Sequence, residues 1–115
     1  MKIKVGNCNY RIIEVNNKND KDLWDKSKNE LRLYGLCDNV NGIIKVWQGL
    51  PEDRKRRTLT HEITHAFLNA YWDSFNLKGR YDNEDMCCFM ETFGEEILRI
   101  ANEYFLEKSS RFKNQ

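Results

Sequence analysis

Hydrophobic and polar residues alternate along the first fifteen residues, a pattern that is typical of β-strands. Ile3 and Val5 alternate with lysines, and a second run rich in β-branched residues follows after a short turn. We therefore expect a β-hairpin over residues 1–15. A polar loop should follow over 16–20, and the spacing of the apolar residues in 21–33 predicts a short helix.

Residues 34–50 show the pattern of a second hairpin. Asn41-Gly42 is the strongest short-range turn signal in the chain, and the apolar run Ile43–Trp47 after it predicts a strand. Pro51 suits the first turn of a helix, because its missing N–H would be unsatisfied there in any case. The apolar spacing that follows predicts a helix running to about Trp72.

The last third of the chain predicts one more helix after a polar loop over 73–82, capped by Asp82 or Asn83. Its expected core face consists of apolar residues at helical spacing: Met86, Phe89, Met90, Phe93, Ile97, Ile100 and Tyr104. We expect a single domain over 1–108 and a polar tail over 109–115. The fold class is α+β, with a small antiparallel or mixed sheet packed on two helices.

Composition narrows the class of protein. The chain has 115 residues, of which 40% are hydrophobic and 32% charged, within the range of globular domains. The net charge of +1 favours neither nucleic acid nor a membrane as partner. No apolar run could span a bilayer and the N-terminus lacks a signal-peptide pattern, so we expect a cytoplasmic protein whose four cysteines are thiols.

The motif His61-Glu62-x-x-His65 lies inside the predicted helix after Pro51. Residues four apart on a helix project from adjacent turns of one face, so the two imidazoles could meet at one metal ion. The chain has only these two histidines. Two nitrogen ligands with a carboxylate base beside them form the arrangement of zinc peptidases. The helix is apolar almost all round after the motif, which predicts buried histidines that need a partner.

A catalytic zinc ion usually has three protein ligands, and no third histidine exists. The best candidates are the acidic and amide residues that open the last helix, Asp82-Asn83-Glu84-Asp85. Thiolates also bind zinc, so Cys87 and Cys88 are alternatives, although small buried apolar roles fit them better. A cysteine nucleophile is not favoured, since it would leave Glu62 unexplained.

Three segments resemble the small ImmA/IrrE-like metallopeptidases of phages and mobile elements, which show the gluzincin pattern. They are Tyr34-Gly35-Leu36-Cys37-Asp38, the segment Thr58-Leu59-x-His61-Glu62-x-x-His65-Ala66, and Glu84-x-x-Cys87-x-x-Met90-Glu91. The last departs from the family's Glu-x-x-Ala-x-x-Phe-Ala. The resemblance covers about two thirds of the chain.

The resemblance implies a zincin-like fold and a zinc-dependent peptidase. His61, His65 and Glu84 would bind Zn2+, with Asp85 as the alternative third ligand, and Glu62 would be the general base for the zinc-bound water. The strand Ile43–Trp47 would align an extended peptide as an edge strand. The substrate would be a specific intracellular protein, such as a transcriptional regulator.

Other interpretations of these residues remain. The run Arg54-Lys55-Arg56-Arg57 favours a solvated first helical turn over a nucleic-acid or acidic-partner patch. An oxyanion-stabilising residue would come from Arg80, Tyr81 or Tyr34. The alternative function is a non-catalytic, zinc-stabilised module that binds or sequesters a protein. The intact Glu62 favours the enzyme, because a structural zinc site needs no base.

Overall fold

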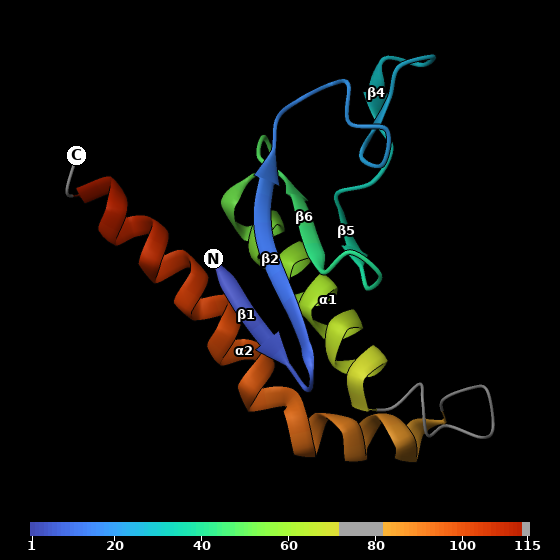
Figure 1. Cartoon of the computed structure of the whole chain (residues 1–115), viewed down its shortest axis with the longest axis vertical. Coiled ribbons are helices and arrows are strands. Elements are labelled where there is room, and N and C mark those ends of the chain that lie inside the picture. The colour runs from blue at the N-terminus through green and yellow to red at the C-terminus, as the bar shows by residue number, and fades with distance from the viewer. Residues whose placement is uncertain (72–81, 114–115) are drawn as a thin grey trace.

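The structure is a computed structural model that describes residues 1–71 and 82–113. Within them the chain is an α+β fold with one four-stranded mixed sheet, a separate two-stranded ribbon and two helices. Figure 1 shows α1 lying across one face of the sheet and α2 running obliquely past the β1 edge. The predicted loop at 73–82 lies outside the described residues except for Asp82.

Both predicted hairpins are confirmed. β1 (Lys2–Val5) pairs antiparallel with β2 (Cys8–Val15), and β5 (Gly35–Asp38) pairs antiparallel with β6 (Ile43–Trp47). The loop between β5 and β6 spans residues 39–42 and is longer than a two-residue Asn-Gly turn; within it Gly42 takes a positive φ of 66°.

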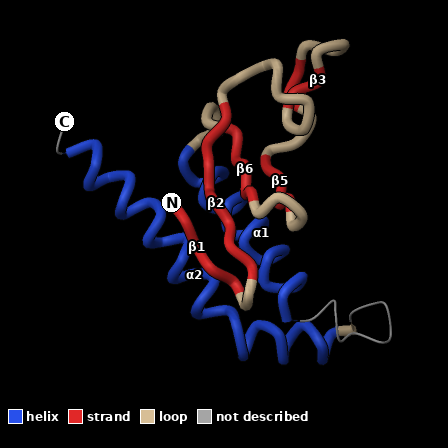
Figure 2. The backbone as a smooth tube through the Cα atoms, in the orientation of Figure 1, coloured by secondary structure: helices blue, strands red, loops and turns tan. Residues whose placement is uncertain are grey.

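The two hairpins join through parallel pairing of β2 with β6, which gives the strand order β1-β2-β6-β5. The expectation that Ile43–Trp47 forms an edge strand is therefore wrong. β6 lies between β2 and β5, and β5 forms the edge instead (Figure 2). Turn chemistry specifies each hairpin locally, whereas pairing between the hairpins depends on contacts far apart in sequence.

The helix predicted over 21–33 is also wrong. Two short strands, β3 (Trp24–Asp25) and β4 (Glu30–Leu31), form a ribbon that projects beyond the sheet (Figures 1 and 2). The Asp25 carboxylate accepts hydrogen bonds from the backbone N–H groups of Ser27 and Lys28. Such side-chain bonds offer the backbone a turn in place of a helix.

The helix after Pro51 is confirmed as α1 (Glu52–Tyr71). The final helix is confirmed at its start, because α2 (Asn83–Lys113) begins after Asp82, whose carboxylate accepts a bond from the N–H of Asp85 at 2.8 Å. It does not end at Lys108, so most of the predicted tail is helical. Extending an existing helix costs far less than starting one, and polar residues can continue it.

The core lies between the sheet and the two helices. It is built mainly from Val5, Tyr10, Ile12, Ile44, Val46, Leu59, Ile63, Ala66, Phe67, Phe89, Ile97, Ile100, Ala101 and Phe105. The predicted α2 face is corrected at two positions, since Met86 and Met90 are exposed. Met90 follows Phe89 by one residue and so points about 100° away from it on a helix.

Two ion pairs that share Glu14 connect three elements. Lys55 of α1 lies 2.7 Å from the Glu14 carboxylate of β2, and Lys108 of α2 lies 2.8 Å from the same group. Tyr104 donates a further hydrogen bond to it. Lys55 is only 5% exposed, so this cluster anchors both helices on the sheet. Neither helix, over its described residues, is long and apolar enough to cross a membrane.

Candidate metal centre

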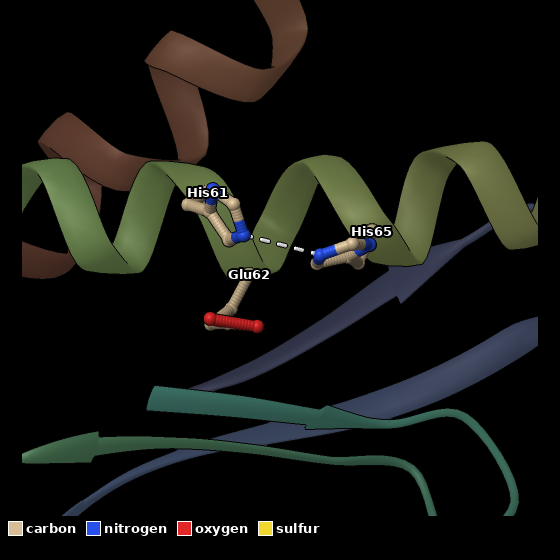
Figure 3. A group of neighbouring side chains, drawn as sticks. All are labelled: His61, Glu62 and His65. Atoms are coloured by element: carbon tan, nitrogen blue, oxygen red, sulfur yellow. Dashed lines mark hydrogen bonds between the residues drawn. The ribbon is translucent and has the colours of Figure 1, made fainter. Parts of the chain in front are cut away.

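His61 and His65 stand on adjacent turns of α1, as their spacing predicts. Their Nε2 atoms are 3.1 Å apart (Figure 3). Two nitrogens bound tetrahedrally to one zinc ion at 2.0–2.1 Å would lie about 3.3–3.4 Å apart. The imidazoles are therefore already placed at nearly the separation that a shared ion needs.

Both histidines are exposed, which corrects the expectation that they are buried. The apolar run after Ile63 fills the core face of α1, but the histidine face is not covered by the described parts of the sheet or of α2. An exposed pair is open to an ion and leaves room for water or a ligand at that ion, as catalytic metal sites require.

Glu62 lies on a different side of α1 from the histidines. It is 7% exposed, and its carboxylate points from the helix toward the sheet (Figure 3). Burial raises the pKa of this carboxyl group, whereas the nearby His61 acts to lower it. A metal-capable atom from each of His61, Glu62 and His65 lies within 4.8 Å of the others, so this group could hold a metal ion.

Gly35 of β5 allows α1 to approach the sheet beside Glu62. A Cβ atom at Gly35 would lie 2.7 Å from Thr58 Cγ2 and 3.1 Å from Glu62 Cγ. This Cβ would also lie 2.9 Å from the Lys45 carbonyl oxygen, so a larger residue here would require neighbouring atoms to shift. The sequence contained no sign of this role, because close packing of two distant segments leaves no local pattern.

A cleft of about 320 Å³ opens beside the metal-capable group, between α1 and the start of β5. We call it the α1–β5 cleft. It is lined by Leu33, Tyr34, Gly35, Arg54, Arg57, Thr58, His61 and Glu62. Of the three oxyanion candidates, Tyr34 lines this cleft, and Arg80 and Tyr81 lie outside the described residues. A reacting group placed here would be within reach of both His61 and Glu62.

The predicted third ligand, Glu84, lies at the exposed start of α2. Among the described residues, the metal-capable group consists of His61, Glu62 and His65, and Glu84 is not part of it. Asp85, the alternative, exchanges hydrogen bonds with Asp82 in a helix cap. Ligation by Glu84 or Asp85 thus stays a prediction.

The cysteines are free thiols, as expected. Cys87 and Cys88 are exposed, which corrects their predicted burial, and Cys88 Sγ lies 3.9 Å from a Glu84 oxygen. Burial, with the negative charges of Glu62 and Asp38, raises the pKa of Cys37 to about 12. Cys37 therefore stays protonated at neutral pH and is a poor nucleophile.

Three residues of the basic run at the start of α1 are exposed, as expected of a solvated turn, but Lys55 is buried. Lys55 is buried against Glu14, and Arg56 lies over the Phe105 ring at 4.3 Å. Arg54 and Arg57 line the α1–β5 cleft instead. Consecutive residues of a helix point to different sides. The four basic residues, although adjacent in sequence, therefore lie in three different environments.

No protein-family model matches the chain, and comparisons with curated proteins and with solved structures find no match. The site is therefore interpreted from its own geometry. Two imidazole nitrogens beside a carboxylate form a donor set that suits a borderline-soft divalent ion.

Proposed function

We propose that the protein is a zinc-dependent metallopeptidase with a zincin-like fold, and that it hydrolyses a peptide bond in a specific intracellular protein. One observation carries the proposal. The Nε2 atoms of His61 and His65 are 3.1 Å apart, and the buried carboxylate of Glu62 lies within reach of the same point. The resemblance of the motif segments to ImmA/IrrE-like metallopeptidases supports the same reaction class.

The proposed reaction assigns a separate role to each residue of the site. His61 and His65 would hold the zinc ion, with Glu84 as third ligand and Asp85 as the alternative. When bound, zinc acidifies a water molecule and polarises the scissile carbonyl group. Glu62 accepts a proton from the attacking water and passes it to the leaving amine. Tyr34, which lines the cleft, would donate a hydrogen bond to the oxyanion.

The edge strand β5 is the part of the sheet that suits an extended peptide. The Tyr34 carbonyl accepts a bond from the N–H of Trp47 at 2.9 Å, so alternate residues from Tyr34 onward face β6. The backbone groups of Gly35 and Cys37 then point to the open edge, where no other described strand pairs. A substrate strand added there would lie beside Glu62.

Replacement of Glu62 by Gln tests this proposal. The zinc-loaded protein is incubated with a mixture of proteome-derived peptides, and new termini are identified by mass spectrometry. Glu62→Gln keeps the size of the side chain but removes the proton acceptor. We expect it to fold and bind zinc, yet to cleave roughly a hundred- to ten-thousandfold more slowly.

The matched control is Glu95→Gln, which neutralises an exposed carboxylate on α2 and should leave cleavage unchanged. Undiminished cleavage by Glu62→Gln would contradict hydrolysis at this site. A zinc-loaded wild-type protein that cleaves no peptide would favour the alternative, a non-catalytic binding module.

A further inference from the structure

Two arginines in the α1–β5 cleft have no role in the reaction described above. Arg54 and Arg57 lie on the wall of the cleft that is formed by the first two turns of α1. Among the described residues that line the cleft, the only carboxylate is that of Glu62, which is buried and faces the sheet. Arg54 and Arg57 therefore place positive charge on the exposed wall of the cleft.

Neither arginine has a strong partner within the described residues. The Cζ atom of Arg54 lies over the Tyr34 ring, 5.4 Å from its centroid, and no described carboxylate pairs with this guanidinium. Arg57 approaches Asp53 at 3.4 Å, but both side chains are more than half exposed. Exposed ion pairs of this kind contribute little to the stability of a protein. Arg57 can therefore exchange Asp53 for another anion.

The cation–π contact with Tyr34 distinguishes Arg54 from an ordinary surface arginine. The contact joins α1 to the residue before β5 and restrains the guanidinium on the wall of the cleft. A guanidinium that is already oriented loses less entropy when it binds a carboxylate, and its donors fit both oxygens of that group. The cleft is thus prepared for a carboxylate.

We propose that Arg54 and Arg57 form a carboxylate-binding subsite, so that the preferred substrates are peptides with an acidic group near the scissile bond. The inference rests on the proposed function, because it places the peptide relative to His61 and the metal. The carboxylate could belong to an Asp or Glu side chain or to the C-terminus of the peptide.

The spacing along α1 sets the distance of that group from the reaction. Arg57 precedes His61 by four residues and Arg54 precedes it by seven, which corresponds to about 6 and 10 Å along the axis. An extended peptide advances about 3.3 Å per residue. The acidic group should therefore lie about two or three residues from the scissile bond.

The run that contains both arginines does not form a nucleic-acid surface. Lys55 is neutralised by Glu14, and Arg56 is stacked on Phe105, away from the cleft. A phosphate backbone needs several cations along an open surface, whereas two arginines beside a metal-capable group in a 320 Å³ cleft suit a single small anion.

Peptide hydroxamates provide a test that does not depend on cleavage, because the hydroxamate binds the zinc ion directly. Matched ligands would carry Asp or Asn two or three residues from the hydroxamate, on either side, with an amidated C-terminus. A third set would carry Asn and a free C-terminal carboxylate. Dissociation constants are measured with the zinc-loaded protein at low and high salt.

In at least one series, we expect the carboxylate ligand to bind about tenfold more tightly than its amide counterpart. Arg54→Gln and Arg57→Gln should each reduce this preference, and added salt should weaken it. Arg11→Gln, which alters an exposed arginine on β2 outside the α1–β5 cleft, should retain it in full. The set that shows the preference identifies a side chain or a C-terminus as the source.

Equal binding of acid and amide ligands in every series would overturn the subsite, as would a preference that survives in both variants. Binding of a single-stranded oligonucleotide that is lost in these variants, without any preference among the hydroxamates, would also overturn it. The two proposals fail separately. Acid preference without cleavage of any peptide contradicts hydrolysis alone, whereas cleavage without acid preference contradicts the subsite alone.

Discussion

The two faces of α1 differ in burial and in the polarity of their side chains. Leu59 and Ile63 on one face are fully buried against the sheet and α2. Arg57, His61 and His65 follow each other at four-residue spacing on another face, and all three are exposed. The contrast shows that one helix can supply the stability of the fold from one side and leave the other side free for chemistry.

Substitutions on the two faces should separate these roles, and the largest effect is expected from the buried face. Ile63→Ala removes a fully buried side chain and should lower the free energy of unfolding by about 2–5 kcal/mol. Arg57→Ala, on the exposed face, should change it by less than about 1 kcal/mol. Urea unfolding of zinc-free protein measures both. Losses of similar size would contradict the division between the faces.

Metal removal tests whether the exposed face contributes to stability through its ligand. An ion that binds only the folded state stabilises it by about 4 kcal/mol when its free concentration is a thousand times Kd. Chelation should therefore lower the melting temperature of the wild-type protein. His61→Ala should melt at the same temperature with and without chelator. An unchanged wild-type melting curve after verified metal removal would exclude any stabilising role of the site.

Acid should weaken the ion-pair cluster between the sheet and the helices. Although burial acts to raise it, bonds from Lys108, Lys55 and Tyr104 lower the pKa of Glu14 to about 2, from an ordinary value of 4.5. A lowered folded-state pKa means stability that is complete above pH 4.5 and is lost as the pH falls toward 2. The loss should be on the order of 3 kcal/mol.

Unfolding titrations between pH 5 and pH 2 would measure this loss. Glu14→Gln provides the comparison, because it removes the titrating group and leaves Lys55 buried without a carboxylate. The variant should be less stable at neutral pH and should depend less on pH in this window. An equal pH dependence in the two proteins would assign the acid sensitivity to other carboxylates.

The smallest expected difference concerns the third ligand. Glu84→Ala should weaken zinc binding by at least about tenfold, or 1.4 kcal/mol, relative to Asp85→Ala. Competition with a chromogenic chelator would rank the two variants. The reverse order would transfer ligation to Asp85, and equal affinities would leave the exposed face of α1 as the main part of the site.

Local patterns in the sequence predicted the elements that depend on local chemistry. The hairpin marked by Asn41-Gly42, the start of α1 after Pro51 and the His61–His65 spacing are all present in the structure. Each follows from backbone geometry within a few residues. The same limit explains the error over 21–33, where Asp25 forms turn bonds that helical periodicity does not reveal.

Features that depend on distant segments could not be predicted in the same way. Because β2 pairs with β6, the edge strand is β5 and not β6 as predicted. The expected position of a bound peptide changes accordingly. The burial of Lys55 depends on Glu14, forty-one residues earlier. The exposure of the histidines depends on which face of α1 the sheet covers, and apolar content alone did not identify that face.

The metal content of the purified protein tests the central claim most directly, because both proposals require an ion between His61 and His65. Elemental analysis of wild-type protein should find about one zinc per chain. Glu62→Gln should retain it, and His61→Ala and His65→Ala should each lose it. A full equivalent of zinc in either histidine variant, or a wild-type protein that binds no zinc when supplied with it, would contradict the account.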